Sequence, residues 1–241
     1  MKFAIFITGT DTGAGKTVIS GYLLRFLLEK GYKAITQKWV ETGCDRGLSQ
    51  DIRSHTSLSG KTSDKIFSGD RAPYILSYPA SPHLAARVDG VTIDVSAIIR
   101  AFHNLKQNFD AVIVEGSGGA LVPVNSNNLL IDITARLELP VLIIAENKLG
   151  AINHTLLTVE SLRRRKIPVT GIVFNRTSGK YDEKLLKDNI KTVRGISGEK
   201  ILGELPYNRN LTKNYEAFPP IGEKILKSLK SFFKTGSGKI T

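Results

Sequence analysis

The feature that most constrains this chain is a glycine-rich loop between an apolar run and a helical segment near the amino terminus. The loop reads Gly9-Thr10-Asp11-Thr12-Gly13-Ala14-Gly15-Lys16-Thr17. Its glycines allow the backbone to curl so that successive amides and the dipole of the following helix face a phosphate. The lysine then reaches the terminal phosphates, and the threonine hydroxyl is available to Mg²⁺. The sequence therefore predicts a P-loop, stretched so that five residues instead of four separate Gly9 from Gly15.

Apolar, β-rich runs alternate with segments of helical spacing along most of the chain. The runs cover residues 3–8, 33–40, 111–114, 140–145, 169–174 and 200–205, and the helical segments cover 16–30, 95–107, 129–137, 151–165 and 180–193. Runs that are apolar on both faces are typical of buried parallel strands. Their alternation with helices indicates right-handed crossovers. We therefore expect an α/β, P-loop NTPase-like fold with a mostly parallel sheet and helices on both faces.

This pattern also suggests how the chain is divided. We expect a single domain over residues 1–234 and a tail, 235–241, that frays because it has no core residues. The stretch 43–82 is rich in Ser, Gly and Asp and has little periodicity, so we expect loops and short helices there. Such segments lie at the carboxyl edge of a parallel sheet, where ligands bind.

Composition and charge limit the partners of the chain. The apolar content of 41% is that of a globular protein, and no apolar run is long enough to span a membrane. A single cysteine, Cys44, allows no intramolecular disulfide and favours the reducing cytoplasm. The net charge of +12 could attract nucleic acid, but the clusters at 163–166 and 224–234 fit helix ends and solvated helix faces. We expect no nucleic-acid and no membrane partner.

Six further segments carry a resemblance to one family of P-loop enzymes. They are Lys38-Trp39-Val40-Glu41-Thr42-Gly43 and the segments 79–83, 114–119, 148–154, 171–175 and 203–206. In this order, and with the same stretched loop, the chain resembles the dethiobiotin synthetases. The resemblance implies an ATP-dependent ligase that joins CO₂ to 7,8-diaminononanoate, activates the carbamate with ATP and closes a cyclic urea. Trp39 replaces a common proline and Gly13-Ala14 a bulkier pair, so nucleotide selectivity stays open.

The resemblance also implies roles for individual residues. The catalytic residues would be Lys38, Lys16 and Thr12. ATP would contact Gly13, Ala14, Gly15, Lys16, Thr17, Val18, Asn175 and Pro206. Magnesium would be bound by Thr17, Asp51 and Glu115, because hard oxygen ligands suit this ion. The alternatives are a solvated lysine at 38, a helix-capping Asp51 and a turn-forming Asn175.

The substrate contacts implied by the resemblance fall into two groups. One group, Thr12, Lys38, Thr42 and Gly118, surrounds the loop. The other group begins a helical segment whose free amides suit the substrate carboxylate, and consists of Leu149, Gly150, Ala151 and Asn153. In the family this segment reaches the substrate of the neighbouring subunit, so the resemblance implies a homodimer with active sites at the interface.

The four histidines receive no catalytic role from the sequence. His55, His83, His103 and His154 have neither the spacing of metal ligands nor the setting of a nucleophile triad.

Two other P-loop classes remain as alternatives to this assignment. One is an amide ligase of the cobyrinate amidating type, which would normally add a glutaminase domain. The other is a partition-type switch ATPase, which binds DNA through basic patches. Such ATPases carry a second lysine at the position of Asp11, five residues before Lys16, and this chain does not.

Overall fold

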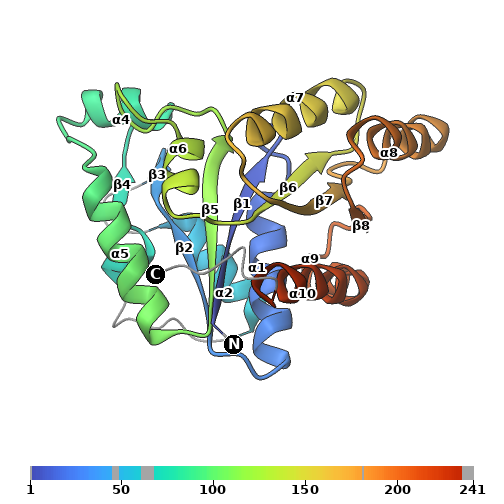
Figure 1. Ribbon diagram of the computed structural model, residues 1–241, viewed down its shortest axis with the longest axis horizontal. Helices are drawn as coiled ribbons and strands as arrows, with labels where there is room; N and C mark the ends of the chain where they lie inside the picture. Colours follow the sequence, from blue (N-terminus) through green and yellow to red (C-terminus); the bar gives the residue numbers. More distant parts are fainter. Residues whose placement is uncertain (1, 45–48, 61–67, 181, 235–241) are drawn as a thin grey trace.

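Six strands form one parallel sheet in the order β2-β5-β1-β6-β7-β8, seen in the centre of Figure 1. The computed structural model describes residues 2–44, 49–60, 68–180 and 182–234. The strands are β1 (Phe3–Gly9), β2 (Ala34–Lys38), β5 (Ala111–Gly119), β6 (Val141–Glu146), β7 (Val169–Asn175) and β8 (Ile201–Leu205). Each pair of neighbouring strands runs parallel. The predicted fold class is confirmed, while the tail expected at 235–241 lies outside the described residues.

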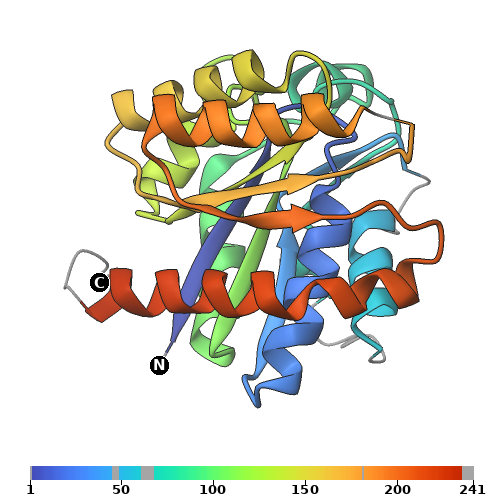
Figure 2. The ribbon, with the colours of Figure 1, turned by 90° about the vertical axis from the view of Figure 1, so that its right-hand side faces the viewer.

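Helices cover both faces of this sheet. One face carries α1 (Lys16–Glu29), α2 (Gln50–Ser59) and α10 (Pro219–Lys234), and the other carries α5 (Val95–Asn108), α6 (Leu130–Arg136), α7 (Ala151–Arg164) and α8 (Glu183–Ser197). Figure 2 shows the layers from the side, with α7 and α8 above the sheet and α1 and α10 below it. The residues of β1 alternate between two cores, because successive side chains of a strand point to opposite faces.

Shorter elements complete the fold. They are β3 (Val40–Thr42), β4 (Tyr74–Leu76), α3 (Ser68–Arg71), α4 (Pro82–Val88), α9 (Leu211–Asn214) and the 3₁₀ helix η2 (Tyr215–Ala217). Strands β3 and β4 pair in a separate two-stranded sheet. The described part of the stretch 43–82 contains the helices α2 and α3, in line with the predicted short helices, and also the strand β4, which was not predicted.

The run 33–40 is not the single strand that its apolar character predicts. Strand β2 ends at Lys38, and β3 then leaves the main sheet to pair with β4. Between them Trp39 is fully buried, with its ring 4.9 Å from that of Phe6 and its Nε1 donating to Gln37 Oε1 at 3.0 Å. This large side chain is therefore packed into the core at the point where the chain leaves the main sheet.

Capping residues explain where the predicted helices begin and end. The helix expected at 180–193 begins at Glu183, because the Asp182 side chain accepts a hydrogen bond from Lys184 N, and it continues to Ser197. The expected left-handed glycine after the first helix is confirmed, since α1 ends at Glu29 and Gly31 has φ 83°.

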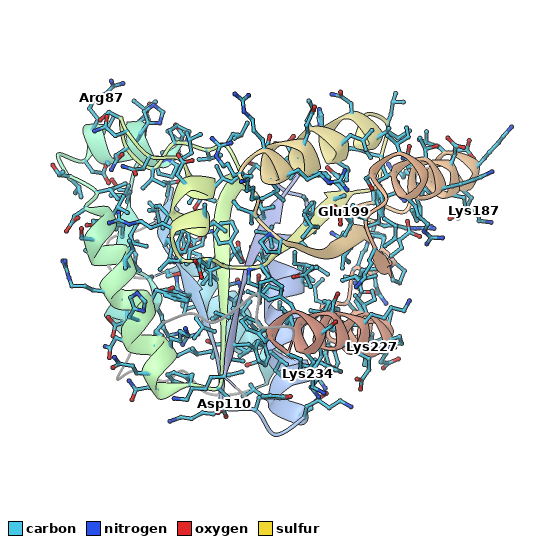
Figure 3. All side chains as sticks on the ribbon, in the orientation of Figure 1. Arg87, Asp110, Lys187, Glu199, Lys227 and Lys234 are labelled. Carbon is cyan, nitrogen blue, oxygen red and sulfur yellow. The ribbon has the colours of Figure 1, made fainter. Side chains whose placement is uncertain are left out.

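The lysines near the carboxyl end lie on the outer face of α10. The inner face of this helix is buried and includes Ile221, Ile225 and Leu229. The outer face includes Lys227 and Lys234, which are exposed and lie at the surface in Figure 3. This arrangement confirms the interpretation of the cluster at 224–234 as a solvated helix face. Within the described residues, no helix combines the length and the apolar character that a membrane crossing requires.

Candidate active site

The loop between β1 and α1 has the backbone of a phosphate cradle. Gly13 and Gly15 adopt φ of 81° and 97°, in the left-handed region that glycine enters without steric cost, and Gly15 caps α1. A Cβ on Gly9 would lie 2.9 Å from Lys16 Nζ. The lysine side chain therefore passes over Gly9, and its Nζ donates to Asp11 O at 3.1 Å. The geometry is the one that the P-loop prediction requires.

Two carboxylates and a second lysine meet beside this loop. The register of the parallel strands places Lys38, at the end of β2, opposite Glu115 of β5. Lys38 Nζ lies 2.8 Å from Glu115 Oε1 and 2.7 Å from Asp51 Oδ2, and Asp51 comes from the first turn of α2. The hydroxyl of Thr17 is 3.0 Å from Asp51 Oδ1 and 3.1 Å from Glu115 Oε1. Polar side chains from four segments of the chain, α1, β2, α2 and β5, therefore meet at one place beside the loop.

The charges of this cluster are strongly coupled. Burial alone would raise the pKa of Glu115, but the charge of Lys38 and a hydrogen bond from His55 hold it well below its usual range. Burial would likewise lower the pKa of Lys38, and the two carboxylates outweigh it so that this pKa is raised. Burial and the nearby charge of Lys38 lower the pKa of Lys16 to about 8. Lys38 is therefore the partner of the carboxylates, while Lys16 is the cation that an incoming anion would stabilise.

The oxygen atoms of Thr17, Asp51 and Glu115 fit a hard divalent cation. The single hydroxyl proton of Thr17 cannot be donated to both carboxylates at once, although both lie within hydrogen-bond distance. A cation that accepts all three oxygens removes this conflict. Magnesium typically binds one or two carboxylates together with phosphate and water. The donor set therefore fits Mg²⁺ alongside a nucleotide held by the loop.

A cavity of about 590 Å³ opens over this cluster. It brings together many of the residues expected in the site, namely Thr12, Gly13, Lys16, Thr17, Lys38, Thr42, Asp51, Glu115 and Gly118. The remaining lining residues are Glu41, Cys44, Gln50, the segment Pro79–Pro82, Ser117 and Val122. The predicted catalytic, magnesium and loop-side substrate residues therefore share one cavity.

The remaining predicted nucleotide contacts lie around the loop and outside this cavity. Asn175, at the end of β7, donates from Nδ2 to Ala14 O at 2.9 Å, and a Cβ on Gly15 would come within 2.1 Å of the same nitrogen. The Asn175 side chain thus stabilises the conformation of the loop. Val18 is half-buried in α1, and Pro206 is exposed after β8.

The expected carboxylate-binding segment also lies outside the cavity. Gly150, with φ 90°, precedes the first residue of α7 and, as a glycine, offers no capping side chain. Ala151 is buried, whereas Asn153 is exposed and Leu149 is 80% exposed. Ala151 N already donates to Lys148 O at 3.1 Å, so within the described residues the amides of Ile152 and Asn153 are the ones left for a ligand that approaches from outside this chain's own cavity.

Two residues of the site were missed by sequence reasoning. His55 is fully buried, and its Nε2 lies 2.7 Å from Glu115 Oε2. Glu41 accepts hydrogen bonds from Gln50 N at 2.8 Å and from Asp51 N at 2.9 Å, and so holds the amino end of α2. The available signal for His55 was its spacing of four residues from Asp51, which places the two on one helix face.

Comparison with known proteins gives consistent matches along the chain. A family model described as an AAA domain matches residues 4–215. The ATP-dependent dethiobiotin synthetase BioD of Chlorobaculum tepidum is 38% identical over 91% of this chain and 92% of its own length. The protein of the same name from Thermodesulfovibrio yellowstonii is 35% identical over 95% of this chain and 96% of its own length.

Solved structures with a similar fold come from other P-loop ATPases. A ParA family ATPase from Chlorobium tepidum aligns with a TM-score of 0.58 and 14% identity, over 98% of this chain and 99% of its own. The cell division ATPase MinD of Pyrococcus furiosus aligns with a TM-score of 0.56 and 16% identity, over 94% of this chain and 99% of its own. At these identities the likeness concerns the fold alone.

Proposed function

The chain belongs to the family of ATP-dependent dethiobiotin synthetases, and on this premise we propose which of its residues carry out the reaction. The observation that carries the proposal is the convergence of Lys16, Thr17, Lys38, Asp51 and Glu115 on one cavity at the carboxyl ends of β1, β2 and β5. This is the edge at which parallel sheets bind ligands.

The reaction proceeds in three steps that make different demands on the site. CO₂ adds to one amine of 7,8-diaminononanoate, and a proton leaves, to give a carbamate. A carbamate oxygen then attacks the γ-phosphorus of ATP, and ADP departs to leave a carbamic-phosphoric anhydride. The second amine attacks the carbonyl carbon, and phosphate leaves as the ring closes. Negative charge is therefore present beside the γ-phosphate throughout, and fixed cations lower the barrier.

The two lysines divide this work. Lys16, on the P-loop, faces the nucleotide phosphates, and its side chain is the one without a close carboxylate partner in the described site. Lys38 lines the same cavity, close enough that, besides burial, its charge lowers the pKa of Lys16, and Thr12, Thr42 and Gly118 line it too. We assign Lys38 to the carbamate and the transferring phosphoryl group, with Thr12 as a hydrogen-bond partner at the amine end.

Magnesium is the second cofactor in this proposal. Thr17, Asp51 and Glu115 would hold the ion, and when bound it neutralises charge on the phosphate oxygens. The residues supply oriented oxygen atoms, because Glu41 fixes the helix turn that carries Asp51 and the sheet fixes Glu115.

We assign residues of the curled loop and of the first turn of α1 to the nucleotide, namely Gly13, Ala14, Gly15 and Val18. Asn175 and Pro206 are assigned to the base. The Nδ2 atom of Asn175 already bonds to the loop, so its Oδ1 is the atom that would accept from an exocyclic amino group.

A homodimer would complete the substrate site. Large apolar side chains are exposed at Leu121, Leu149 and Leu157, and a groove of about 350 Å³ runs between the loop and α7 beside two of them. Burial of such side chains favours association. A second copy seated there would bring its segment 149–153, with the amides of Ile152 and Asn153 at the start of α7, to the carboxylate end of the substrate.

We also propose a cytoplasmic location. The proposal is supported by Cys44, the single cysteine of the chain, which is buried beside Glu41 as a free thiol and so fits a reducing compartment.

The reaction is tested by measuring phosphate release from ATP with Mg²⁺ and bicarbonate, with and without 7,8-diaminononanoate, while mass spectrometry follows the product. We expect diamine-dependent phosphate release matched by a cyclic urea. Diamine-independent hydrolysis would refute the assignment, and DNA retardation would then test the partition-type alternative.

Two variants test the division of roles. Lys16→Ala and Lys38→Ala are both expected to abolish turnover, because each removes a cation beside the transferring phosphoryl group. Only Lys16→Ala should greatly weaken ADP binding, measured by calorimetry. Equal weakening by both variants would refute the assignment of Lys16 to the nucleotide and Lys38 to the carbamate.

A further inference from the structure

Glu115 is held from two sides, and one side is a histidine for which the sequence analysis predicted no role. His55 lies on α2, one helical turn after Asp51. Its ring is completely buried, and Nε2 lies 2.7 Å from Glu115 Oε2. Both residues of this pair are almost inaccessible, with side chains that are 0% and 1% exposed. The contact is therefore part of the interior of the protein and is shielded from solvent screening.

The two oxygens of Glu115 have separate partners. Oε1 lies 2.8 Å from Lys38 Nζ and 3.1 Å from Thr17 Oγ1, on the cavity side. Oε2 has His55 as its partner, on the side of α2. A carboxylate held at only one oxygen can rotate about its terminal bond, because that torsion is broad. The histidine removes this freedom and fixes Oε1 toward the place where the proposed magnesium ligands meet.

The other ring nitrogen indicates which way the hydrogen bond runs. Nδ1 of His55 is buried, and within the described part of the chain no atom is placed to form a hydrogen bond with it. A proton on Nδ1 would be a buried donor without an acceptor, which costs free energy. The ring proton therefore belongs on Nε2, from which it is donated to Glu115 Oε2.

We propose that His55 is a positioning residue that orients Glu115 for magnesium. It touches neither the substrate nor the metal, and it acts by holding the far oxygen of a ligand carboxylate. The inference rests on the proposed role of Glu115 as a magnesium ligand. Groups that orient a ligand in this way typically change metal affinity by about 10–100-fold when they are removed.

The test uses His55→Met, which keeps an uncharged side chain of similar length but has no donor, and His55→Gln, which retains an N–H donor. The readout is the factor by which Mg²⁺ tightens ADP binding, measured by calorimetry with and without the ion. We expect His55→Met to lower the apparent Mg²⁺ affinity by about 10-fold or more. ADP affinity without Mg²⁺ should not change, because the P-loop is untouched. His55→Gln should restore most of the loss.

Leu58→Ala is the matched control, because Leu58 lies on the same helix as His55 and packs against Gly21 of α1. We expect it to lower thermal stability and to leave the Mg²⁺ effect unchanged. An equal loss of Mg²⁺ affinity in Leu58→Ala would overturn the inference, because helix packing alone would then explain the result. Wild-type Mg²⁺ affinity in His55→Met would also overturn it.

A further variant separates this inference from the magnesium site on which it rests. Glu115→Gln is expected to lower the Mg²⁺ effect on ADP binding at least as much as His55→Met does. If Glu115→Gln has no effect, the proposed metal role of Glu115 fails. If Glu115→Gln lowers the effect and His55→Met does not, the metal role stands and only the positioning role of His55 fails.

Discussion

Replacement of Lys38 by methionine should have opposite effects on magnesium binding and on turnover. The Lys38 ammonium lies within 2.8 Å of both Asp51 and Glu115, and the same Glu115 oxygen faces Thr17. The lysine therefore neutralises the carboxylates that the proposed metal would use. Methionine keeps most of the apolar stem and removes the charge. We expect tighter Mg²⁺ binding to the nucleotide complex and loss of the reaction.

The size of this effect follows from the charges. Two unit charges about 4 Å apart interact by about 4 kcal/mol at the effective dielectric constant of about 20 that suits partly buried sites. The substitution gains only part of this repulsion energy, because in the unsubstituted protein the Lys38 ammonium can move away from an arriving Mg²⁺ while it remains in the cavity. Two unpaired carboxylates also repel each other and take up protons more readily. We therefore expect about 10- to 100-fold tighter binding, or about 1.4–2.8 kcal/mol.

The assay is calorimetric titration of Mg²⁺ into the complex with ADP, beside a phosphate-release assay. Lys30→Met is the control, because Lys30 follows α1 at the end opposite the loop and pairs with Glu223. It removes the same net charge far from the carboxylates and should change Mg²⁺ affinity little. Weaker Mg²⁺ binding in Lys38→Met would refute the reasoning, since Lys38 would then support the ion instead of competing with it.

Three further predictions follow from other parts of the structure. Gly21→Ala should lower the free energy of unfolding by about 1 kcal/mol or more in urea titrations, because the new Cβ would lie 2.8 Å from Leu58. The cost of this overpacking is larger than the stability that alanine adds through its higher helix propensity. Cys44, whose pKa is raised to about 11 by burial and by Glu41, should react with iodoacetamide at pH 8 about 100-fold more slowly than an ordinary thiol, and faster only as pH rises toward that value. Leu157→Asp should convert the proposed dimer into a folded monomer in sedimentation experiments and abolish turnover, because Leu157 is exposed on α7; a dimer that persists would argue against this interface.

The main sheet and the loop could be predicted because their signals are local. Each buried strand is a short apolar run, and each long helix has a regular apolar stripe. Gly13 and Gly15 adopt the positive φ that a curled loop demands. Lys38 ends β2, and Glu115 follows the apolar run 111–114 at the last position where β5 pairs with β2, although β5 itself continues to Gly119. The change from β2 to β3 at Trp39 could not be predicted, because an apolar run does not show where the chain leaves one sheet and enters another.

The two functional residues that sequence analysis missed, His55 and Glu41, both depend on the position of helix α2. Its segment is polar and has little periodicity, so its bounds could not be predicted, and the four-residue spacing of Asp51 and His55 does not show which group the histidine faces. The partner of His55 is Glu115, sixty residues farther along the chain, and only the folded structure brings them to 2.7 Å. Glu41 is similar, since an acidic residue within the short strand β3 gives no sign that its carboxylate binds the backbone of a later helix.

The placement of α2 separates the two halves of the site. Lys16 and the amides of the loop depend on β1 and α1, whereas Asp51 and His55 depend on a helix held by Glu41 at its amino end and by Gly21 at its face. A displacement of α2 would move the acidic groups and leave the phosphate cradle in place. Gly21→Ala, which must displace α2, should therefore weaken the effect of Mg²⁺ on ADP binding while ADP binding without Mg²⁺ stays unchanged. A parallel loss of both would mean that the loop and α2 move as one unit.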